Sequence, residues 1–398
     1  MDFELTEEQK MLKTMVRDLC TKELDPLAAE IDENCIYPAE NIKKLAELGL
    51  IGLPFPEQYA GGGGTPVDFA IVMEELSRVC ASTSTVYMVT AGLAGKPIFK
   101  FANEDQRKRF TVPIAKGEKI CCFALTEPSA GSDATALETT ATKTEGGYLL
   151  NGTKIFITNG NESEIILVFA TVDKSLGHKG VTAFVVEKGT PGYSVGKLEH
   201  KLGIRGSSTA ELIFEDCFVP EENILGKIGE GFKIAISAID SSRISVAAQA
   251  LGIAQGAFDK AIEYAKDRQQ FGKPIINLQA IQWMLADMAT QLECARMLTY
   301  RAAWLEKNNL PFVKEACMAK LYAAEAAMFV TDKAIQIFGG YGYVKDYPVE
   351  RYFRDARICS IYEGTSEMQR LTIARHLMRE AQFVDAAKEK TVKAAQTA

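Results

Sequence analysis

The chain has 398 residues, of which 47% are hydrophobic and 24% charged, and its formal net charge is −7. This length allows two or three hydrophobic cores, and the composition is that of an ordinary globular protein. The acidic balance argues against a nucleic-acid-binding surface. No apolar stretch reaches the ~20 residues that cross a bilayer, and acidic residues stand where a signal peptide carries basic ones. We therefore expect no membrane contact and a cytoplasmic location, or the mitochondrial matrix for a processed eukaryotic chain.

The nine cysteines and three histidines do not have the spacing of metal ligands. No C-x-x-C pair occurs, so we expect neither a zinc nor an iron–sulfur site. The odd number of cysteines favours reduced thiols in a reducing compartment. Cys121 and Cys122 are adjacent within an apolar stretch, and we expect them on a strand with one side chain facing each side.

The first third of the sequence predicts helices. Thr6 and Gln9 form a candidate capping box, followed by apolar residues at helical spacing to about Pro26. Further helices are predicted over residues 40–49, 66–80, 84–102 and 103–116. The four glycines at 61–64 lack the Lys-Ser/Thr of a P-loop, so we interpret them as a flexible connection.

The sequence then changes character twice. Between 118 and 228, short β-branched and aromatic runs are bounded by turn residues, and Asn151-Gly152 predicts a hairpin turn. Helical spacing returns over 231–269, 276–307, 311–338 and 367–380, which suits an antiparallel four-helix bundle. The predicted fold class is α+β and multidomain. It has a helical N-terminal domain (1–117), a middle antiparallel β-barrel or sandwich (118–228) and a C-terminal helical bundle (229–398).

Two stretches of the β region could line a planar ligand. "FALTEPSAGSD" (123–133) leaves a strand and enters a turn of small residues, whose backbone groups can hydrogen-bond the edge of a heterocycle. "KIFITNG" (154–160) carries Phe156 and Thr158 two residues apart, on one side of a strand. Taken alone, the first is typical of a loop and the second of β packing.

"RQQFGKP" (268–274) closes a predicted helix, with Arg268 and Phe271 on one helical face and Gly272 as the terminating residue. Arg268 could stabilise the negative end of the helix dipole, or its guanidinium could bind a phosphate.

Two later stretches contain closely spaced glycines or an isolated acid. "QIFGGYGY" (336–343) runs from a helix into glycines that would let a pyrophosphate approach, but it is not the G-x-G-x-x-G of a Rossmann unit. "IYEGTSEMQ" (361–369) places Glu363 between an aromatic residue and Gly364. By itself this stretch is a turn with one acid.

Together, in this order and this α–β–α layout, these stretches resemble the flavin-dependent acyl-CoA dehydrogenases. The resemblance extends from "LTEEQKML" to "ARHLMRE", nearly the whole chain, and its most specific parts are "FALTEPSAGSD", "RQQFGKP", "IFGGYGY" and "IYEGTSEMQ". The stretch "AAQALGIAQGA" (247–257) is similar to short-chain, butyryl-CoA dehydrogenases. The resemblance implies FAD between the β domain and the bundle, and a homotetramer built as a dimer of dimers, with FAD reaching a neighbouring subunit.

The resemblance also implies the residues that bind FAD. Those assigned to FAD are Phe123, Leu125, Thr126, Ser132, Phe156, Ile157, Thr158, Arg268, Phe271, Gln279, Gln336, Gly339, Gly340, Thr365 and Glu367. Several relatives have Gln where this chain has Glu367, and a carboxylate is a poor neighbour for a phosphate. Those assigned to the acyl-CoA are Ser132, Asp240, Arg243 and Gly364. Without the resemblance, Asp240 and Arg243 could equally be a solvated pair on a helix surface.

The resemblance gives Glu363 a definite role as the base that removes the α-proton of the thioester, while the β-hydride passes to the flavin. Such a carboxylate needs a pKa near neutral, which apolar walls can supply. The family holds the thioester carbonyl through the backbone N–H of this Glu and a ribityl hydroxyl. Some relatives place the base on the helix around "AIDSSR", where this chain has Ser242.

The implied function is oxidation of a short, branched or ring-bearing acyl-CoA to the 2-enoyl-CoA, with electrons passing to an electron-transfer flavoprotein. The alternatives are an enoyl-CoA reductase of an anaerobe, an oxygen-using acyl-CoA oxidase, and a non-catalytic family member. Relatives acting on glutaryl-CoA carry an Arg near Ser84, which is absent here. Lys96 could serve a polar or carboxylated acyl group, or its ammonium could simply reach solvent.

Overall fold

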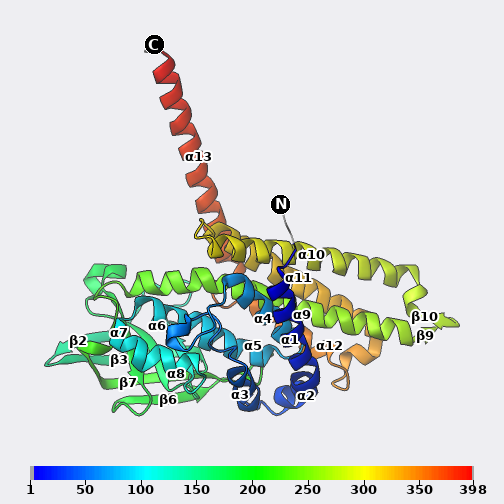
Figure 1. The fold of residues 1–398 in the computed structure, drawn as a ribbon, viewed down its shortest axis with the longest axis horizontal. Helices are drawn as coiled ribbons and strands as arrows, with labels where there is room; N and C mark the ends of the chain where they lie inside the picture. The colour runs from blue at the N-terminus through cyan, green and yellow to red at the C-terminus, as the bar shows by residue number, and fades with distance from the viewer. Residues whose placement is uncertain (1–3, 397–398) are drawn as a thin grey trace.

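The computed structural model describes residues 4–396, with side chains described to residue 382. Figure 1 shows the β domain at one end of an elongated helical body, with helix α13 projecting from that body. All nine cysteines are free thiols. Within the described residues, no helix is long and apolar enough to cross a membrane.

The N-terminal helices follow the predicted pattern closely. Thr6 caps α1 with the full capping box, because its hydroxyl accepts from the Gln9 N–H and the Gln9 side chain accepts from the Thr6 N–H. Pro66 begins α4 behind a second capping box at Thr65. The helices of this part are α1 (Glu7–Leu19), η1 (Cys20–Leu24), α2 (Asp25–Glu33), α3 (Ala39–Glu47), η2 (Glu57–Tyr59), α4 (Pro66–Ser77), α5 (Ala81–Tyr87), η3 (Met88–Ala94), α6 (Gly95–Phe101), α7 (Glu104–Gln106), η4 (Arg107–Thr111) and α8 (Val112–Ala115).

The middle part forms one sheet in the order β6-β7-β3-β2-β4-β5-β8, with β1 added against β4. Its elements are β1 (Cys121–Ala124), β2 (Thr140–Thr144), β3 (Gly147–Thr158), β4 (Ile165–Thr171), η5 (Lys174–Lys179), β5 (Val181–Glu187), β6 (Tyr193–Leu198), β7 (Thr209–Pro220), η6 (Glu221–Asn223) and β8 (Ile224–Leu225). The prediction of a purely antiparallel domain was wrong in part. β1 runs parallel to β4, and β2 meets β4 in one parallel bridge, so the sheet is mixed.

The C-terminal part is built around the long helix α9 (Gly231–Asp267). The other elements are β9 (Gln269–Gln270), β10 (Lys273–Pro274), η7 (Ile275–Asn277), α10 (Gln279–Lys307), α11 (Val313–Phe338), η8 (Gly339–Tyr343), α12 (Val349–Ala356), η9 (Arg357–Ser360) and α13 (Ser366–Gln396). Helices α9, α10, α11 and α13 match the predicted bundle, whereas the short helix α12 was missed.

Three buried clusters hold these parts together. The largest joins N-terminal helices to α9, α10, α11 and α12, so the helical parts share one core. The other two lie on opposite faces of the sheet. Cys121 belongs to one of them and Cys122 to the other, which confirms that these thiols face opposite sides.

Two local predictions were wrong for a visible reason. Gly152 does not turn the chain but lies inside β3 at a bulge opposite β7, and the hairpin turn comes earlier, at Gly146 with φ 71°. Helix α9 ends at Asp267, so Arg268 and Phe271 do not share a helical face. Residues 269–274 instead form a two-residue hairpin, with Phe271 (φ 54°) and Gly272 (φ 75°) in its turn.

Candidate active site

Glu363 lies in a left-handed turn between η9 and α13. Its φ is 52° and that of Gly364 is 92°, a conformation that only glycine adopts without strain. Gln369 and Lys320 stabilise the turn, because both donate hydrogen bonds to the Gly364 carbonyl, at 2.8 and 2.6 Å. Strained non-glycine residues cluster at functional sites. Glu363 is therefore fixed by its surroundings in a conformation that its own residue type disfavours.

The carboxyl group of Glu363 is poorly solvated. The residue as a whole is partly buried, but its Oε2 is shielded from solvent and has no hydrogen-bond partner among the described residues. Burial raises the pKa of Glu363 to about 7, although the nearby Ser242 hydroxyl and the charges of Lys320 and Arg243 act in the opposite direction. A base with this pKa can be ionised at neutral pH and still accept a proton.

Helix α9 carries polar side chains close to the Glu363 carboxyl group. Arg243 and Asp240 form an ion pair of 2.7 Å with most of both side chains buried, so the solvated-pair interpretation was wrong. Arg243 also donates to Cys317 Sγ at 3.3 Å. Three buried polar atoms at this point lack partners among the described residues: Ser242 Oγ, Arg243 Nε and Glu363 Oε2. Unsatisfied buried polar atoms gathered at one point are what a bound polar ligand would complete.

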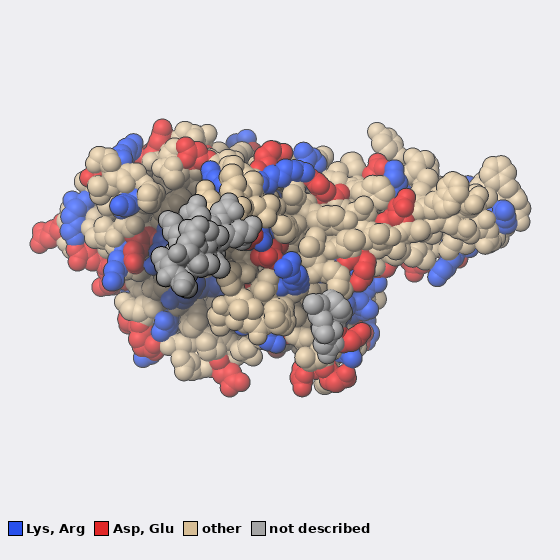
Figure 2. Space-filling model, turned by 90° about the horizontal axis from the view of Figure 1, so that it is seen from above, with Lys and Arg blue, Asp and Glu red and all other residues tan. Residues whose placement is uncertain are grey.

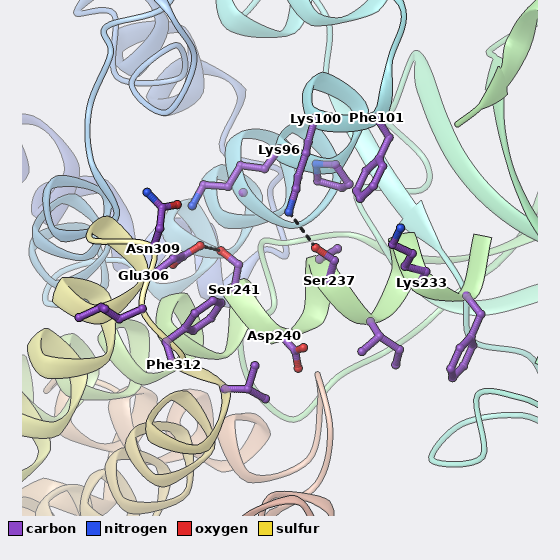
Figure 3. A pocket seen from close by; sticks show the side chains of 17 residues that line it. Lys96, Lys100, Phe101, Lys233, Ser237, Asp240, Ser241, Glu306, Asn309 and Phe312 are labelled. Carbon is purple, nitrogen blue, oxygen red and sulfur yellow. Dashed lines mark hydrogen bonds between the residues drawn. The ribbon is translucent and has the colours of Figure 1, made fainter. Parts of the chain in front are cut away.

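A groove of about 700 Å³ runs over the N-terminal half of α9 and includes Asp240 (Figure 3). Lys96, Lys100 and Lys233 lie along it, and Lys100 donates to Ser237 at 3.2 Å. Lys96 is partly buried, with its ammonium over the ring of Phe69 at 4.8 Å. The groove therefore offers cationic side chains beside apolar walls, and it ends close to the Arg243 ion pair.

Two segments of the sheet are tied together by a buried ion pair. The Lys154 ammonium lies 2.6 Å from Glu127 Oε1 and also donates to the Leu125 carbonyl at 3.2 Å. The Ile155 N–H donates to the Thr126 carbonyl at 2.9 Å. These contacts place the stretch that follows Phe123 directly against the stretch that contains Phe156.

The side chains of these two segments divide between core and surface. Phe123, Leu125 and Ile157 are buried, whereas Thr126 and Thr158 are partly exposed and Ser132 is exposed. Phe156 has φ 58° and is 59% exposed. A large aromatic ring held outward in a strained conformation fits a planar cofactor such as a flavin, which would cover it.

The other predicted cofactor residues lie at the far end of α9. Arg268 is exposed, has no carboxylate within 4 Å among the described residues, and stacks over Tyr341 at 5.5 Å. It lines a second groove of about 910 Å³ with Phe271, Gly339 and Gly340. Phe271 is 87% exposed, and Figure 2 shows few charged side chains on this extension of the molecule. Gln279 and Gln336 are exposed nearby on α10 and α11.

Thr365 and Glu367 begin α13 beside the Glu363 turn. The Thr365 hydroxyl accepts from the Met368 N–H at 3.3 Å, and Glu367 points to solvent with its pKa lowered by its own backbone N–H and by Thr365. The predicted residues thus gather at three places on one chain: the two sheet segments, the Glu363 turn with the adjoining part of α9, and the Arg268 groove. No group of three or more His, Cys, Asp or Glu side chains between residues 4 and 382 could hold a metal ion.

Sequence reasoning missed three residues that shape the turn. The Tyr362 hydroxyl donates to Gln249 Oε1, and Gln249 in turn donates to Ser84 Oγ at 3.0 Å and Thr85 Oγ1 at 2.7 Å. Lys320 donates to the Gly364 carbonyl within the turn. Gln249 and Lys320 come from distant helices, so no local pattern could have pointed to them.

Family models match the chain in three consecutive pieces. They are the N-terminal domain (residues 6–118), middle domain (122–217) and C-terminal domain (229–378) of the acyl-CoA dehydrogenases. Among curated relatives, the short-chain-specific acyl-CoA dehydrogenase of Clostridium acetobutylicum is 50% identical, with 95% of this chain and 100% of the relative covered. The acryloyl-CoA reductase (NADH) of Anaerotignum propionicum is also 50% identical, with 95% and 96% covered.

Solved structures give the same result. Butyryl-CoA dehydrogenase of Megasphaera elsdenii superposes with a TM-score of 0.93 at 47% identity, with 95% of this chain and 100% of that chain covered. A chain in a structure described as the electron transferring flavoprotein of Acidaminococcus fermentans gives 0.94 at 50% identity, with the same coverage. Fold, site and matches together define a flavoprotein oxidoreductase. The chain belongs to the acyl-CoA dehydrogenase family, close to the short-chain and butyryl-CoA dehydrogenases, and FAD is the cofactor of that family.

Proposed function

We propose that this chain removes the α-proton of a short acyl-CoA with Glu363 and thereby forms the 2-enoyl-CoA. The observation that carries the proposal is the Glu363 carboxyl group, whose Oε2 is shielded from solvent without a hydrogen-bond partner among the described residues and whose pKa burial raises to about 7. FAD, when bound, supplies the acceptor for the β-hydride. The chain itself orients the thioester, excludes water and holds the proton on the Glu363 carboxylate.

The residues around Glu363 would each have a distinct task. The backbone N–H of Glu363 would donate to the thioester carbonyl and stabilise the negative charge that develops there. Gly364 leaves the space through which the thioester approaches. Asp240 and Arg243 would contact the CoA arm in the groove of Figure 3, with Ser132 near the pantetheine. The lysines of the groove, Lys100 and Lys233, suit the phosphate groups of CoA.

The cofactor would bind at two places. Thr126 would hydrogen-bond the flavin ring, and the exposed ring of Phe156 would pack against it. Arg268, Phe271 and the glycines at 339–340 would take the pyrophosphate and adenine end of an FAD held by a second copy of the chain, in a homotetramer. The exposed guanidinium of Arg268, which has no carboxylate within 4 Å among the described residues, and the mostly apolar groove beside it support this arrangement. The domain limits 1–117, 118–228 and 229–398 stay a prediction.

A short acyl group fits the polar side chains behind the base. Gln249 connects Tyr362 to α5 through hydrogen bonds, and we expect a long acyl chain to extend toward these polar side chains. Burying an alkyl chain against an amide and two hydroxyl groups without breaking those bonds is unfavourable. A role of Lys96 toward a polar acyl group stays a separate prediction, since its ammonium lies over Phe69.

The electron partner would be an electron-transfer flavoprotein, which the similarity to the Acidaminococcus structure supports. The second candidate function is the reverse reaction, reduction of an enoyl-CoA. The 50% identity to an acryloyl-CoA reductase favours it specifically, and a base with a pKa near 7 can return a proton as well as remove one.

Anaerobic mixing of the purified flavoprotein with saturated acyl-CoAs of increasing length tests the proposal. Butyryl-CoA should bleach the flavin absorbance, and octanoyl-CoA should do so far more slowly. Failure of every saturated thioester to bleach the flavin, with reoxidation of the chemically reduced protein by crotonyl-CoA, would favour the reductase direction. A preparation without flavin would support a non-catalytic member.

A further inference from the structure

Lys320 on α11 is a buried cation close to the proposed base. Its residue exposure is 0%, and its ammonium donates to the Gly364 carbonyl at 2.6 Å. Among the described side chains no carboxylate lies within 4 Å of that ammonium. A buried charge without a close counter-ion is costly, so its retention calls for a compensating role.

Four titratable or charged groups from four elements act on Lys320. They are Cys317 of its own helix, Arg243 of α9, Cys359 of η9 and Glu363 of the turn. Burial raises the pKa of Cys359 to about 12 and also raises that of Cys317, so both thiols are neutral near pH 7. Arg243 is a cation that is already paired with Asp240. His376 of α13 also acts electrostatically on Asp240. Of the four groups, Glu363 is the one that can carry a negative charge beside Lys320 near neutral pH.

We propose that Lys320 is the positioning residue of Glu363: its ammonium fixes the left-handed turn through the Gly364 carbonyl and, as a nearby positive charge, favours the ionised form of the Glu363 carboxylate. This inference rests on the proposed function, because it presumes that Glu363 is the base. The two contributions are separable. Gln369 shares the Gly364 carbonyl but carries no charge, so it supports the turn alone.

The consequence for catalysis follows from the charge. With Lys320 protonated, the Glu363 carboxylate has a favourable electrostatic partner in a poorly solvated place. Without that charge, only the Ser242 hydroxyl and Arg243 would oppose the effect of burial, and ionisation of Glu363 would need a higher pH. Burial lowers the pKa of Lys320 to about 8, so the cation predominates at and below pH 7, where the acidic limb of Glu363 falls.

The test compares pH profiles of kcat/KM for the FAD-loaded protein and two neutral variants. Lys320→Gln keeps a donor for the Gly364 carbonyl and removes the charge, whereas Lys320→Met removes both. Both should move the acidic limb upward by about one pH unit. One unit below the wild-type midpoint, kcat/KM should therefore fall about tenfold beyond any loss on the plateau.

The support of the turn is measured separately, by the plateau value of kcat/KM and by amide hydrogen exchange of the backbone. Lys320→Met, but not Lys320→Gln, should speed amide hydrogen exchange in 361–369 and lower the plateau. Gln369→Leu should lower the plateau and leave the limb in place. Lys333→Gln serves as the matched control, since Lys333 is on the same helix and pairs with Asp332 at the surface, 3.2 Å away. Its profile should match the wild type.

An unmoved acidic limb in Lys320→Gln overturns the proposal, whatever happens on the plateau. If Lys320→Met fails to fold with FAD, Lys320→Gln and Gln369→Leu still decide, because one must move the limb and the other must not. Failure of the proposed function looks different. In that case the wild type would lack a limb near pH 7, and Glu363→Gln would remain active.

Discussion

Lys154 and Glu127 form a buried ion pair of 2.6 Å, with side-chain exposures of 0% and 2%, between the two segments assigned to the flavin. Glu127 also accepts from the backbone N–H groups of Glu138 and Thr139, at 2.5 and 3.0 Å. One carboxylate thus joins the end of β1 to the start of β2, and one ammonium joins both to β3. The shape of the proposed flavin surface depends on this pair.

Lys154→Met should destabilise the protein and weaken FAD binding together. The variant leaves Glu127 buried without its cation, which costs about 3–5 kcal/mol in comparable pairs. Denaturant unfolding measures the first effect, and fluorescence titration of the apoprotein with FAD measures the second. Lys143→Met removes an exposed partner of Glu221 and should change the free energy of unfolding by no more than ~0.5 kcal/mol. Equal effects of the two variants would contradict this account.

Gly364→Ala should abolish most turnover while leaving FAD bound. Its φ of 92° disfavours any side chain, and an added Cβ would lie 2.8 Å from Gln369 Nε2. The turn would have to shift, and with it the Glu363 carboxylate. Gly146→Ala is the control, because that residue also has positive φ (71°) but no atom within 4 Å of the added Cβ. It should cost about 1 kcal/mol of stability and leave kcat unchanged. Wild-type kcat in Gly364→Ala would be incompatible with the proposed site.

Stability should report the raised pKa of Glu363 directly. The folded-state pKa is about 7 and the ordinary value is 4.5, so the folded protein holds this proton more tightly than the unfolded chain. The stabilisation from protonated Glu363 is complete below pH 4.5 and is lost as pH rises through 7. Compared with Glu363→Gln, the wild type should therefore lose free energy of unfolding between these values. A constant difference across the window would show that the pKa is not raised.

Predictions that depend on neighbouring residues agree with the structure, whereas features set by long-range contacts were missed. The capping box at Thr6 and the opposite faces of Cys121 and Cys122 depend on neighbouring residues, and both predictions are confirmed. Asn151-Gly152 carried a strong local turn signal, but β3 pairs with β7 across it, and the sheet overrides the local preference.

The site residues show the same contrast between local and long-range contacts. Glu363 could be singled out through a resemblance covering the whole chain, because its stretch contains the distinctive residues. Lys320 and Lys154 could not, since each acts through a partner more than twenty residues away. Parallel pairing of β1 with β4 was missed for the same reason. Arg268 was placed on a helix because Gly272 is a typical helix terminator, whereas α9 ends earlier, at Asp267.

Acyl-chain length should respond to Gln249. Gln249→Ala removes the acceptor of the Tyr362 hydroxyl and the bonds to Ser84 and Thr85, and it opens space behind Glu363. The ratio of kcat/KM for hexanoyl-CoA to that for butyryl-CoA should rise about tenfold, the effect of one or two methylene groups that gain room. Gln255→Ala, on the same helix but bonded to Asp259 and Arg296, should leave the ratio unchanged. An unchanged ratio in Gln249→Ala would place the acyl chain elsewhere.

The central claim is that Glu363 takes the α-proton, and a single anaerobic turnover tests it most directly. Wild-type protein and Glu363→Gln, both loaded with FAD, are mixed with butyryl-CoA while the flavin absorbance is followed. We predict rapid bleaching in the wild type. In Glu363→Gln, butyryl-CoA should still bind and perturb the flavin spectrum, but bleaching should be slower by a factor of about 10²–10⁴. Bleaching of Glu363→Gln at the wild-type rate would contradict the account.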